Sequence, residues 1–263
     1  MLGIHQSFLN PMSGIILTAE KIGADCLQVF IRSNRGGKRR DISRYEINEF
    51  NTLLLNSNVQ SVVIHAPYYM NPCTEDKTKR NKYLSIIQDD LRFLSYLAGD
   101  VRYVLHPGSS LDLTEDCAMN NLIEFVKDLA PCLFNTKLAV EMMAGAGTQM
   151  LSSYVQLAIF YEAIKNLDNV GFCLDTCHTF GAGLDSMKIY DAYKNKIFVA
   201  HLNNSAAAFG THVDRHANIN AGQISTEYLV DFARQVKTCP MILETPHPED
   251  LIDYTFLIES LKR

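Results

Sequence analysis

Residues 61–68, SVVIHAPY, decide the fold of this chain: a short apolar run of β-type residues ends in a histidine, His65. The same arrangement, an apolar run that ends in a metal-ligand residue or is closely followed by one, recurs along the chain. The other segments are YVLHPG (His106), KLAVE (Glu141), GFCLDTCH (Asp175 and His178), FVAHLN (His201), VDRH (Asp214 and His216) and MILETP (Glu244).

Strand candidates alternate with helical patterns from one end of the chain to the other. The predicted strands cover 3–5, 26–31, 62–65, 103–106, 138–141, 171–175, 197–202 and 241–244. The predicted helices cover about 12–22, 43–55, 84–98, 122–130, 151–167, 186–194, 227–236 and 249–261. Eight strands in strict alternation with helices are typical of an α/β fold, the (β/α)8 TIM barrel. A doubly wound open sheet is the alternative, but it usually has fewer strands. Because no linker interrupts the pattern, we expect one domain over residues 1–263.

The alternation of inward- and outward-facing residues in each strand predicts that the polar residues at the strand ends point to the same side of the barrel wall. Alternate strand residues share a face, so His65 lies on the face of Val63, and Glu141 on that of Ala139. The same spacing holds for His106 and Asp175, so each of these four residues is the last inward-pointing residue of its strand. In barrels of this type the chemistry lies at the C-terminal ends of the strands. We therefore expect the candidate ligands to meet at the C-terminal mouth.

The candidate ligands form a mixed nitrogen and oxygen set that suits zinc or manganese. One divalent ion needs three or four protein ligands, so nine ligands with one shared carboxylate indicate a trinuclear site, which is suited to cleaving a phosphodiester. Glu141, central in the arc, is the predicted bridge. The nine are His65, His106, Glu141, Asp175, His178, His201, Asp214, His216 and Glu244.

Two segments are predicted to be loops at the mouth. Asp175 and His178 lie where a strand becomes a loop and can point to different metals, and residues 203–223 form a long structureless loop that delivers Asp214 and His216. His212, in the same loop, is expected to face solvent. Cys173 and Cys177 lack the usual zinc-knuckle spacing and are interpreted as packing residues.

Composition fits a single soluble domain. The chain has 263 residues, of which 47% are hydrophobic, enough for one sizeable core. It shows neither a secretion signal nor a membrane-spanning run, so we expect an intracellular protein without membrane contact. Seven cysteines, an odd number, argue against a disulfide scaffold. The net charge of −5 does not exclude DNA, because three divalent ions would add roughly six positive charges and a basic surface can be local.

The motifs HAPY, LHPG, CLDTCH, HLN-x-S, DRH and LETP closely resemble those of the endonuclease IV-type apurinic/apyrimidinic (AP) endonucleases, in order and at similar spacing over nearly the whole chain. The resemblance implies a (β/α)8 barrel with three zinc ions at its mouth, manganese being an alternative at one or more positions. By position, the first ion would take His65, His106 and Glu141. The second would take Glu141, Asp175, His201 and Glu244, and the third His178, Asp214 and His216.

The resemblance also implies a reaction. The family hydrolyses the phosphodiester 5′ to an abasic site in duplex DNA and leaves a 3′-hydroxyl and a 5′-deoxyribose phosphate, as a step of base excision repair. A 3′-phosphodiesterase activity would follow from the same site, and Glu141 would be the catalytic residue that holds the bridge. Loop side chains of the family enter the DNA, and Arg35, Tyr68 and Tyr69 match those loops. A monomer suffices for this task.

Two other functions stay open on the sequence. A sugar isomerase or epimerase with one metal would use four of the nine ligands (Glu141, Asp175, His201 and Glu244) and leave five without a role. A DNA-damage binding protein without catalysis would follow if changes around the ligands abolish the reaction. The chain departs from the family pattern near the site at Met142, Met143, Asn204, Ala206 and Ala217, which puts tuning and DNA affinity, rather than the ligands, in question.

Overall fold

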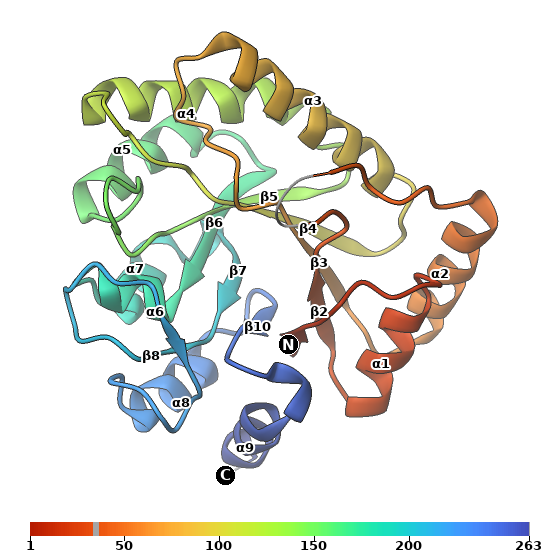
Figure 1. The fold of residues 1–263 in the computed structure, drawn as a ribbon. Coiled ribbons are helices and arrows are strands. Elements are labelled where there is room, and N and C mark those ends of the chain that lie inside the picture. The colour runs from red at the N-terminus through yellow and green to blue at the C-terminus, as the bar shows by residue number, and fades with distance from the viewer. Residues whose placement is uncertain (34–36, 263) are drawn as a thin grey trace.

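The computed structural model describes residues 1–33 and 37–262, and within them parallel strands close into one barrel (Figure 1). The predicted TIM barrel is confirmed. Pairing β1 with both β2 and β10 closes the ring, so the eight strands in the described residues leave no open edge. The strands, in their order around the barrel, are β1 (Leu2–His5), β10 (Met241–Leu243), β7 (Ile197–His201), β6 (Val170–Asp175), β5 (Lys137–Glu141), β4 (Asp100–Leu105), β3 (Ser61–His65) and β2 (Cys26–Val29).

Helices lie around the outside of this barrel (Figure 1). They are α1 (Gly14–Ile22), α2 (Arg44–Asn56), α3 (Lys77–Leu94), α4 (Glu115–Leu129), α5 (Tyr154–Ile164), α6 (Thr176–Gly181), α7 (Ser186–Tyr193), α8 (Thr226–Gln235) and α9 (Ile252–Leu261). Short 3-10 turns cover Ala130–Cys132, Lys194–Lys196 and Pro248–Asp250. No described helix has the length and apolar character needed to cross a membrane.

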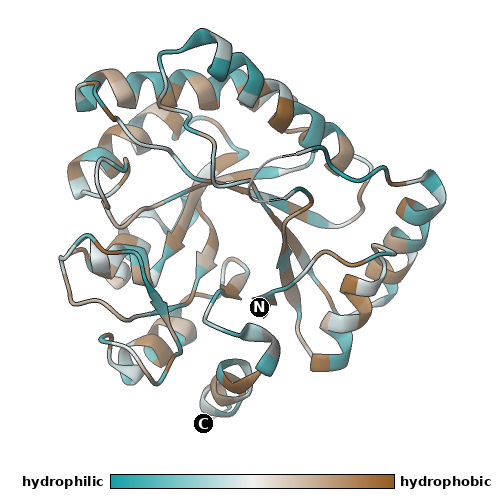
Figure 2. Cartoon of the chain, viewed as in Figure 1, coloured by the Kyte–Doolittle hydropathy of each residue, from teal (hydrophilic) through white to brown (hydrophobic). Residues whose placement is uncertain are grey.

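Apolar stripes and capping residues explain the helices. On α3 an apolar stripe of Leu84, Ile87, Leu91 and Leu94 is buried, while Ala98, in the predicted helix 84–98, lies beyond the helix end and is partly buried. The Asp76 side chain caps the helix by accepting from the backbone of Thr78 and Lys79. The strands carry the most hydrophobic colouring at the centre of the molecule, and the helices alternate between hydrophobic and hydrophilic faces (Figure 2). The core thus lies between the strands and the surrounding helices.

A second, smaller apolar cluster fills the inside of the barrel. It contains Cys26, Val63, Val104, Ala139, Cys173, Phe198, Val199 and Ile242. Val63 and Ala139 precede His65 and Glu141 by two residues, so those two polar residues point along the same inner face toward the mouth. On β1 the residue at the inner position is Gly3. A larger residue does not fit there, because a Cβ would lie 1.9 Å from the carbonyl oxygen of Cys26.

The structure differs from the sequence prediction after β6 and β7. The segment after Asp175 is not a loop: α6 begins at once, and Asp175 is its N-cap, accepting from the backbone N–H of His178 at 2.8 Å. The predicted structureless segment contains a small antiparallel pair, β8 (Asn204–Ser205) and β9 (His216–Ala217). Both elements are too short to show an apolar period, and hydrogen bonds from neighbouring elements hold them.

Candidate metal centre

The strand ends enclose a polar cavity of about 400 Å³ at the mouth of the barrel. It is lined by His65, Tyr68, His106, Glu141, Gln149, His178, Asp214, His216 and Glu244. The two candidate ligands that do not line this cavity, Asp175 and His201, are completely buried beside it. All nine candidate ligands therefore gather at this mouth, as expected from their places at the strand ends.

The first set is formed by β3, β4 and β5. Nε2 of His65 and Nε2 of His106 each lie 3.2 Å from Oε2 of Glu141. His65 donates from Nδ1 to the carbonyl of Ala66 at 2.7 Å, which leaves the lone pair of Nε2 directed into the set.

The second set surrounds the other oxygen of Glu141. Nδ1 of His201 lies 3.2 Å from Oε1 of Glu141, 3.1 Å from Oε2 of Glu244 and 3.7 Å from Oδ2 of Asp175. Glu141 thus faces the first set with Oε2 and the second with Oε1. A carboxylate placed in this way could be shared by two ions, and Oε1 also lies 3.1 Å from Nδ1 of His178, a member of the third set.

The third set joins α6 to the hairpin of β8 and β9. Nε2 of His178 lies 3.2 Å from Oδ2 of Asp214, and Nε2 of His216 lies 3.6 Å from Oδ1 of the same residue. His178 and His216 donate from Nδ1 to the carbonyls of Met142 and Glu244, each at 3.0 Å. Asp175 lies between the second and third sets, with its Oδ2 3.6 Å from Nε2 of His216.

Two amides that sequence reasoning missed hold the ligands in place. The Gln28 side chain donates to Oε1 of Glu244 at 2.6 Å, and its oxygen accepts from Nε2 of His201 at 2.9 Å, which fixes the tautomer of that ring. Asn203 donates from Nδ2 to Oδ2 of Asp175 at 2.7 Å. Gln28 follows the inward-facing Cys26 by two residues, and this spacing was the available signal.

The donor set fits divalent cations. Zinc bonds of about 2.0–2.2 Å at tetrahedral angles would separate neighbouring ligand atoms by about 3.3–3.6 Å. The nitrogen–oxygen separations within the three sets run from 3.1 Å to 3.7 Å. In addition, the buried Nε2 of His216 has no hydrogen-bond partner among the described residues. A cation at the third set would satisfy that atom.

Charge compensation holds the buried cluster together when no cation is bound. Burial alone would raise the pKa values of Glu141 and Glu244, but His201 and other histidines outweigh it and hold both well below the ordinary value. Burial alone would lower the pKa values of His178 and His201, but the surrounding acidic groups raise both well above the ordinary value. A cation that binds here has to displace those protons.

The two cysteines near the site lie within reach of the ligands. Cys173 lies close to Glu141 and His201, and Cys177 close to Asp175 and His216. Burial raises the pKa of both thiols, that of Cys177 to about 12, which disfavours the thiolate that a metal ligand needs. Their interpretation as packing residues stays a prediction.

The residues expected to contact DNA lie partly at this mouth. Tyr68 is 46% exposed, and its ring stacks on His106 with centroids 5.2 Å apart. Tyr69 is 38% exposed, while Arg35 lies outside the described residues. His212 is exposed as expected, but it does not simply face solvent: its Nδ1 donates to the carbonyl of Ala144 at 3.0 Å and ties the hairpin loop to the end of β5.

The departures from the family pattern are structural residues here. Asn204 is buried, and its amide donates to the carbonyls of Ile219 and Ile224 at 2.7 Å and 2.8 Å, which anchors the segment behind the third set. Met142 and Met143 are buried, and Ala206 donates its backbone N–H to Arg215 within the hairpin. Ala217, in β9, is buried as well.

Fold and site together define a TIM barrel with a polynuclear candidate metal centre at its mouth. A family model described as "Xylose isomerase-like TIM barrel" matches residues 16–259. A relative in Clostridium botulinum named "Probable endonuclease 4" is 31% identical over 272 residues, covering 99% of this chain and 97% of its own. The crystal structure of endonuclease IV from Thermus thermophilus superimposes with a TM-score of 0.85 at 27% identity, covering 99% of this chain and 98% of that one. The chain belongs to the endonuclease IV family.

The same fold occurs in proteins with sugar chemistry. A D-tagatose 3-epimerase-like protein superimposes with a TM-score of 0.76 at 18% identity, covering 99% of this chain and 97% of that one. At that identity the likeness concerns the fold alone.

Proposed function

We propose that residues 1–263 form one AP endonuclease domain, which hydrolyses the phosphodiester 5′ to an abasic site in duplex DNA. The products would be a 3′-hydroxyl and a 5′-deoxyribose phosphate, and the same site would trim blocked 3′ ends. The reaction belongs to base excision repair. Membership of the endonuclease IV family supports the reaction class, and the layout of the mouth supports the division of the ligands.

One observation carries the choice between an endonuclease and a mononuclear sugar enzyme. Five candidate ligands lie outside the set that a single ion would use, and they surround the same mouth: His65, His106, His178, Asp214 and His216. A sugar isomerase gives these five no role. In a trinuclear phosphodiesterase site each of them has one.

We assign three zinc ions to the three sets, with manganese as the alternative at one or more of them. Bound divalent ions supply a nucleophile at neutral pH and neutralise the phosphate and the leaving 3′-oxygen. Glu141 holds the first and second sets in register through its two oxygens. Gln28 and Asn203 orient His201 and Asp175, so the chain's own hydrogen bonds preorganise the centre.

The DNA would lie across the mouth, with an abasic nucleotide turned into the cavity. Such a nucleotide lacks a stacked base and costs less to extrude than a paired one. Tyr68 and Tyr69 offer exposed ring faces at the rim that can fill the gap, and Arg35 is assigned to the same task. We propose a monomer that acts inside the cell.

Metal analysis combined with a nicking assay tests the proposal. Purified protein should contain about three zinc ions and should nick a duplex that carries a tetrahydrofuran abasic analogue, which resists elimination by a lyase. One ion per chain together with turnover of a ketose would favour the isomerase. Tight binding of the analogue duplex by fully loaded protein without nicking would favour a damage-binding protein.

A further inference from the structure

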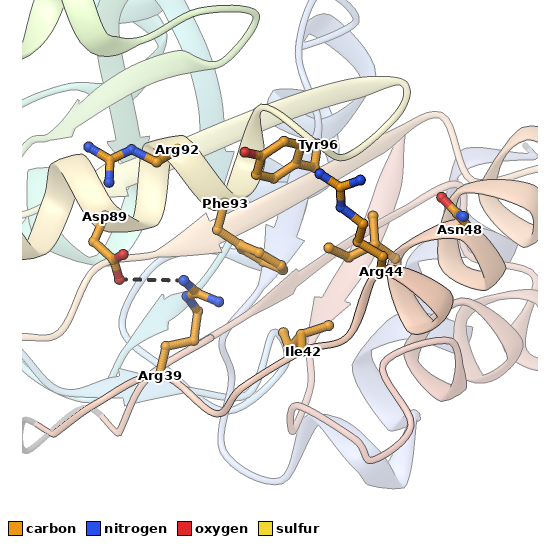
Figure 3. A pocket seen from close by; sticks show the side chains of 9 residues that line it. Arg39, Ile42, Arg44, Asn48, Asp89, Arg92, Phe93 and Tyr96 are labelled. Atoms are coloured by element: carbon orange, nitrogen blue, oxygen red, sulfur yellow. Dashed lines mark hydrogen bonds and ion pairs between the residues drawn. The ribbon is translucent and has the colours of Figure 1, made fainter.

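A second polar cavity, of about 480 Å³, lies between α2, α3 and the loop that joins β2 to α2 (Figure 3). Three arginines line it, one from each of these segments: Arg39, Arg44 and Arg92. The remaining lining residues are Ile42, Ile47, Asn48, Asp89, Phe93 and Tyr96. None of the nine is a candidate ligand, so this cavity is separate from the polar cluster at the mouth.

The charge in this cavity is not balanced by acids. Asp89 is its one acidic lining residue, and Oδ2 of Asp89 is shared between Arg32 and Arg39. Arg44 and Arg92 are exposed, and the guanidinium group of neither forms an ion pair or hydrogen bond with any residue that the structure describes. Two guanidinium groups are therefore free to bind an anion in the described part of the molecule.

The arrangement of these side chains is fixed from behind. Arg39 stacks on Phe93, with its guanidinium carbon 4.2 Å from the ring centroid. The buried Nε of Arg39 has no hydrogen-bond partner among the described residues, although it lies 3.8 Å from Oδ1 of Asp90 as an ion pair. Arg44 and Asn48 lie one turn apart on α2, as do Asp89 and Phe93 on α3. Figure 3 shows Arg39 and Arg44 reaching into the space around Phe93 and Tyr96.

Guanidinium forks with amide and phenol donors beside them are the chemistry that recognises phosphate. Arg44 is also the first residue of α2, where a positive side chain opposes the helix dipole unless an anion lies nearby. The chain carries a net charge of −5, so attraction for a polyanion has to come from local clusters of this kind.

The position of the cavity favours the backbone of DNA as the source of that phosphate. Its wall at Arg39 belongs to the loop that follows β2, the same loop that carries Arg35. Arg32, near the mouth end of β2, pairs with Asp89 and Asp90 and so ties the cavity to the rim of the barrel.

We propose that this arginine-lined cavity is a phosphate-binding subsite that holds the backbone of the duplex outside the incision site. The inference rests on the proposed function, since it assumes that DNA lies across the mouth. This subsite would bind the DNA that flanks the lesion, not the lesion itself.

The test compares Arg44→Gln, Arg92→Gln and the double variant on two duplexes with the same abasic analogue. One duplex spans only a few base pairs, and the other extends a full helical turn to each side. The double variant should bind the long duplex about tenfold more weakly, and its plot of log affinity against log salt should be less steep by about one to two units. Its affinity for the short duplex should stay within about twofold of the wild type.

Lys127→Gln/Lys237→Gln is the matched control. Both residues are exposed, Lys127 in the last turn of α4 and Lys237 just after α8, neither lines the arginine-lined cavity, and their replacement removes the same charge. If the control weakens long-duplex binding as much as the double variant does, the effect is one of net charge and the subsite is refuted. Equal affinity of wild type and double variant for the long duplex refutes it as well.

A second arm separates DNA from free nucleotides. Adenosine monophosphate is titrated into chelator-treated wild type and double variant by calorimetry. Heat that disappears in the double variant, without any dependence on duplex length, would assign the cavity to a free nucleotide and overturn the proposal. Nicking by the wild type is measured in parallel. If nicking fails, the proposed reaction is wrong, while the length-dependent binding still decides the subsite.

Discussion

Nε2 of Gln28 donates a hydrogen bond of 2.6 Å to Oε1 of Glu244, so an amide from β2 fixes a carboxylate at the end of β10. The strands β2 and β10 are both neighbours of β1 in the closed barrel. Because the same amide also accepts from His201, one side chain orients two members of the second set. The orientation of two candidate ligands, Glu244 and His201, therefore depends on Gln28, which is not a candidate ligand itself.

Gln28→Met keeps the length of the side chain and removes both hydrogen bonds. We expect zinc affinity at the second set to fall about 10–100-fold, because His201 loses the partner that fixes its tautomer. Competition with a chromogenic chelator measures this affinity. Gln235→Met, at the exposed end of α8, is the control. Unchanged zinc affinity in Gln28→Met would show that the amide has no orienting role.

Glu141→Gln tests the bridge. The amide keeps the shape of the side chain but offers one oxygen, so the first and second sets lose their shared ligand. We expect the barrel to remain folded by circular dichroism, and nicking of the abasic analogue to slow by at least about 100-fold. A variant that binds fewer zinc ions yet nicks at the wild-type rate would exclude a bridging role.

The metal-free chain should have a stability maximum at mildly acidic pH. Glu141 and Glu244, with lowered pKa values, stabilise the fold above their ordinary pKa of 4.5, and this stabilisation is lost as the pH falls through their folded-state pKa. His178 and His201, with raised pKa values, stabilise it fully below 6.5, and that stabilisation is lost as the pH rises through theirs. The melting temperature of chelator-treated protein should therefore fall from about pH 6 to about pH 8. Zinc should reverse the trend, because metal binding needs deprotonated histidines. A melting temperature that rises over this range without metal would contradict the charge balance.

Asn204→Asp probes a departure from the family pattern. A carboxylate cannot donate to the carbonyls of Ile219 and Ile224, and it would lie buried against both oxygens. We expect the free energy of unfolding to fall by about 2–4 kcal/mol. Urea denaturation measures the change. Asn204→Ser, which avoids the charge, should cost less; an equal loss in both variants would show that the charge adds nothing.

The barrel could be predicted from the sequence because most of the apolar runs end in a polar residue, which marks the end of the strand. The runs before His65 and Glu141 show the strand length and the inward face together, so both the fold and the gathering of the ligands could be predicted. Helix α6 and the hairpin of β8 and β9 could not be predicted in this way. Thr176–Gly181 folds as a helix because Asp175 caps it, and six residues carry too little periodicity to reveal this.

Residues whose role depends on contacts between distant parts of the chain were harder to predict from the sequence. Gln28 has no ligand chemistry of its own, and its importance arises only where β1, β2 and β10 meet. Similarly, Arg44 and Arg92 are far apart in the chain, and each one taken singly is typical of a solvated helix surface. Only the folded chain, in which α2 and α3 line the same cavity, brings them together.

The closed ring of strands also sets the order in which the molecule can be assembled. The second set joins Glu141 to Glu244, which lies close to the end of the 263 residues, and β10 is the strand that completes the ring. A growing chain on the ribosome therefore has only incomplete versions of this set until its last strand emerges. An ion held by the complete set would therefore arrive only after β10 has joined the ring, and it would then tie Glu141, in the middle of the chain, to the end of β10.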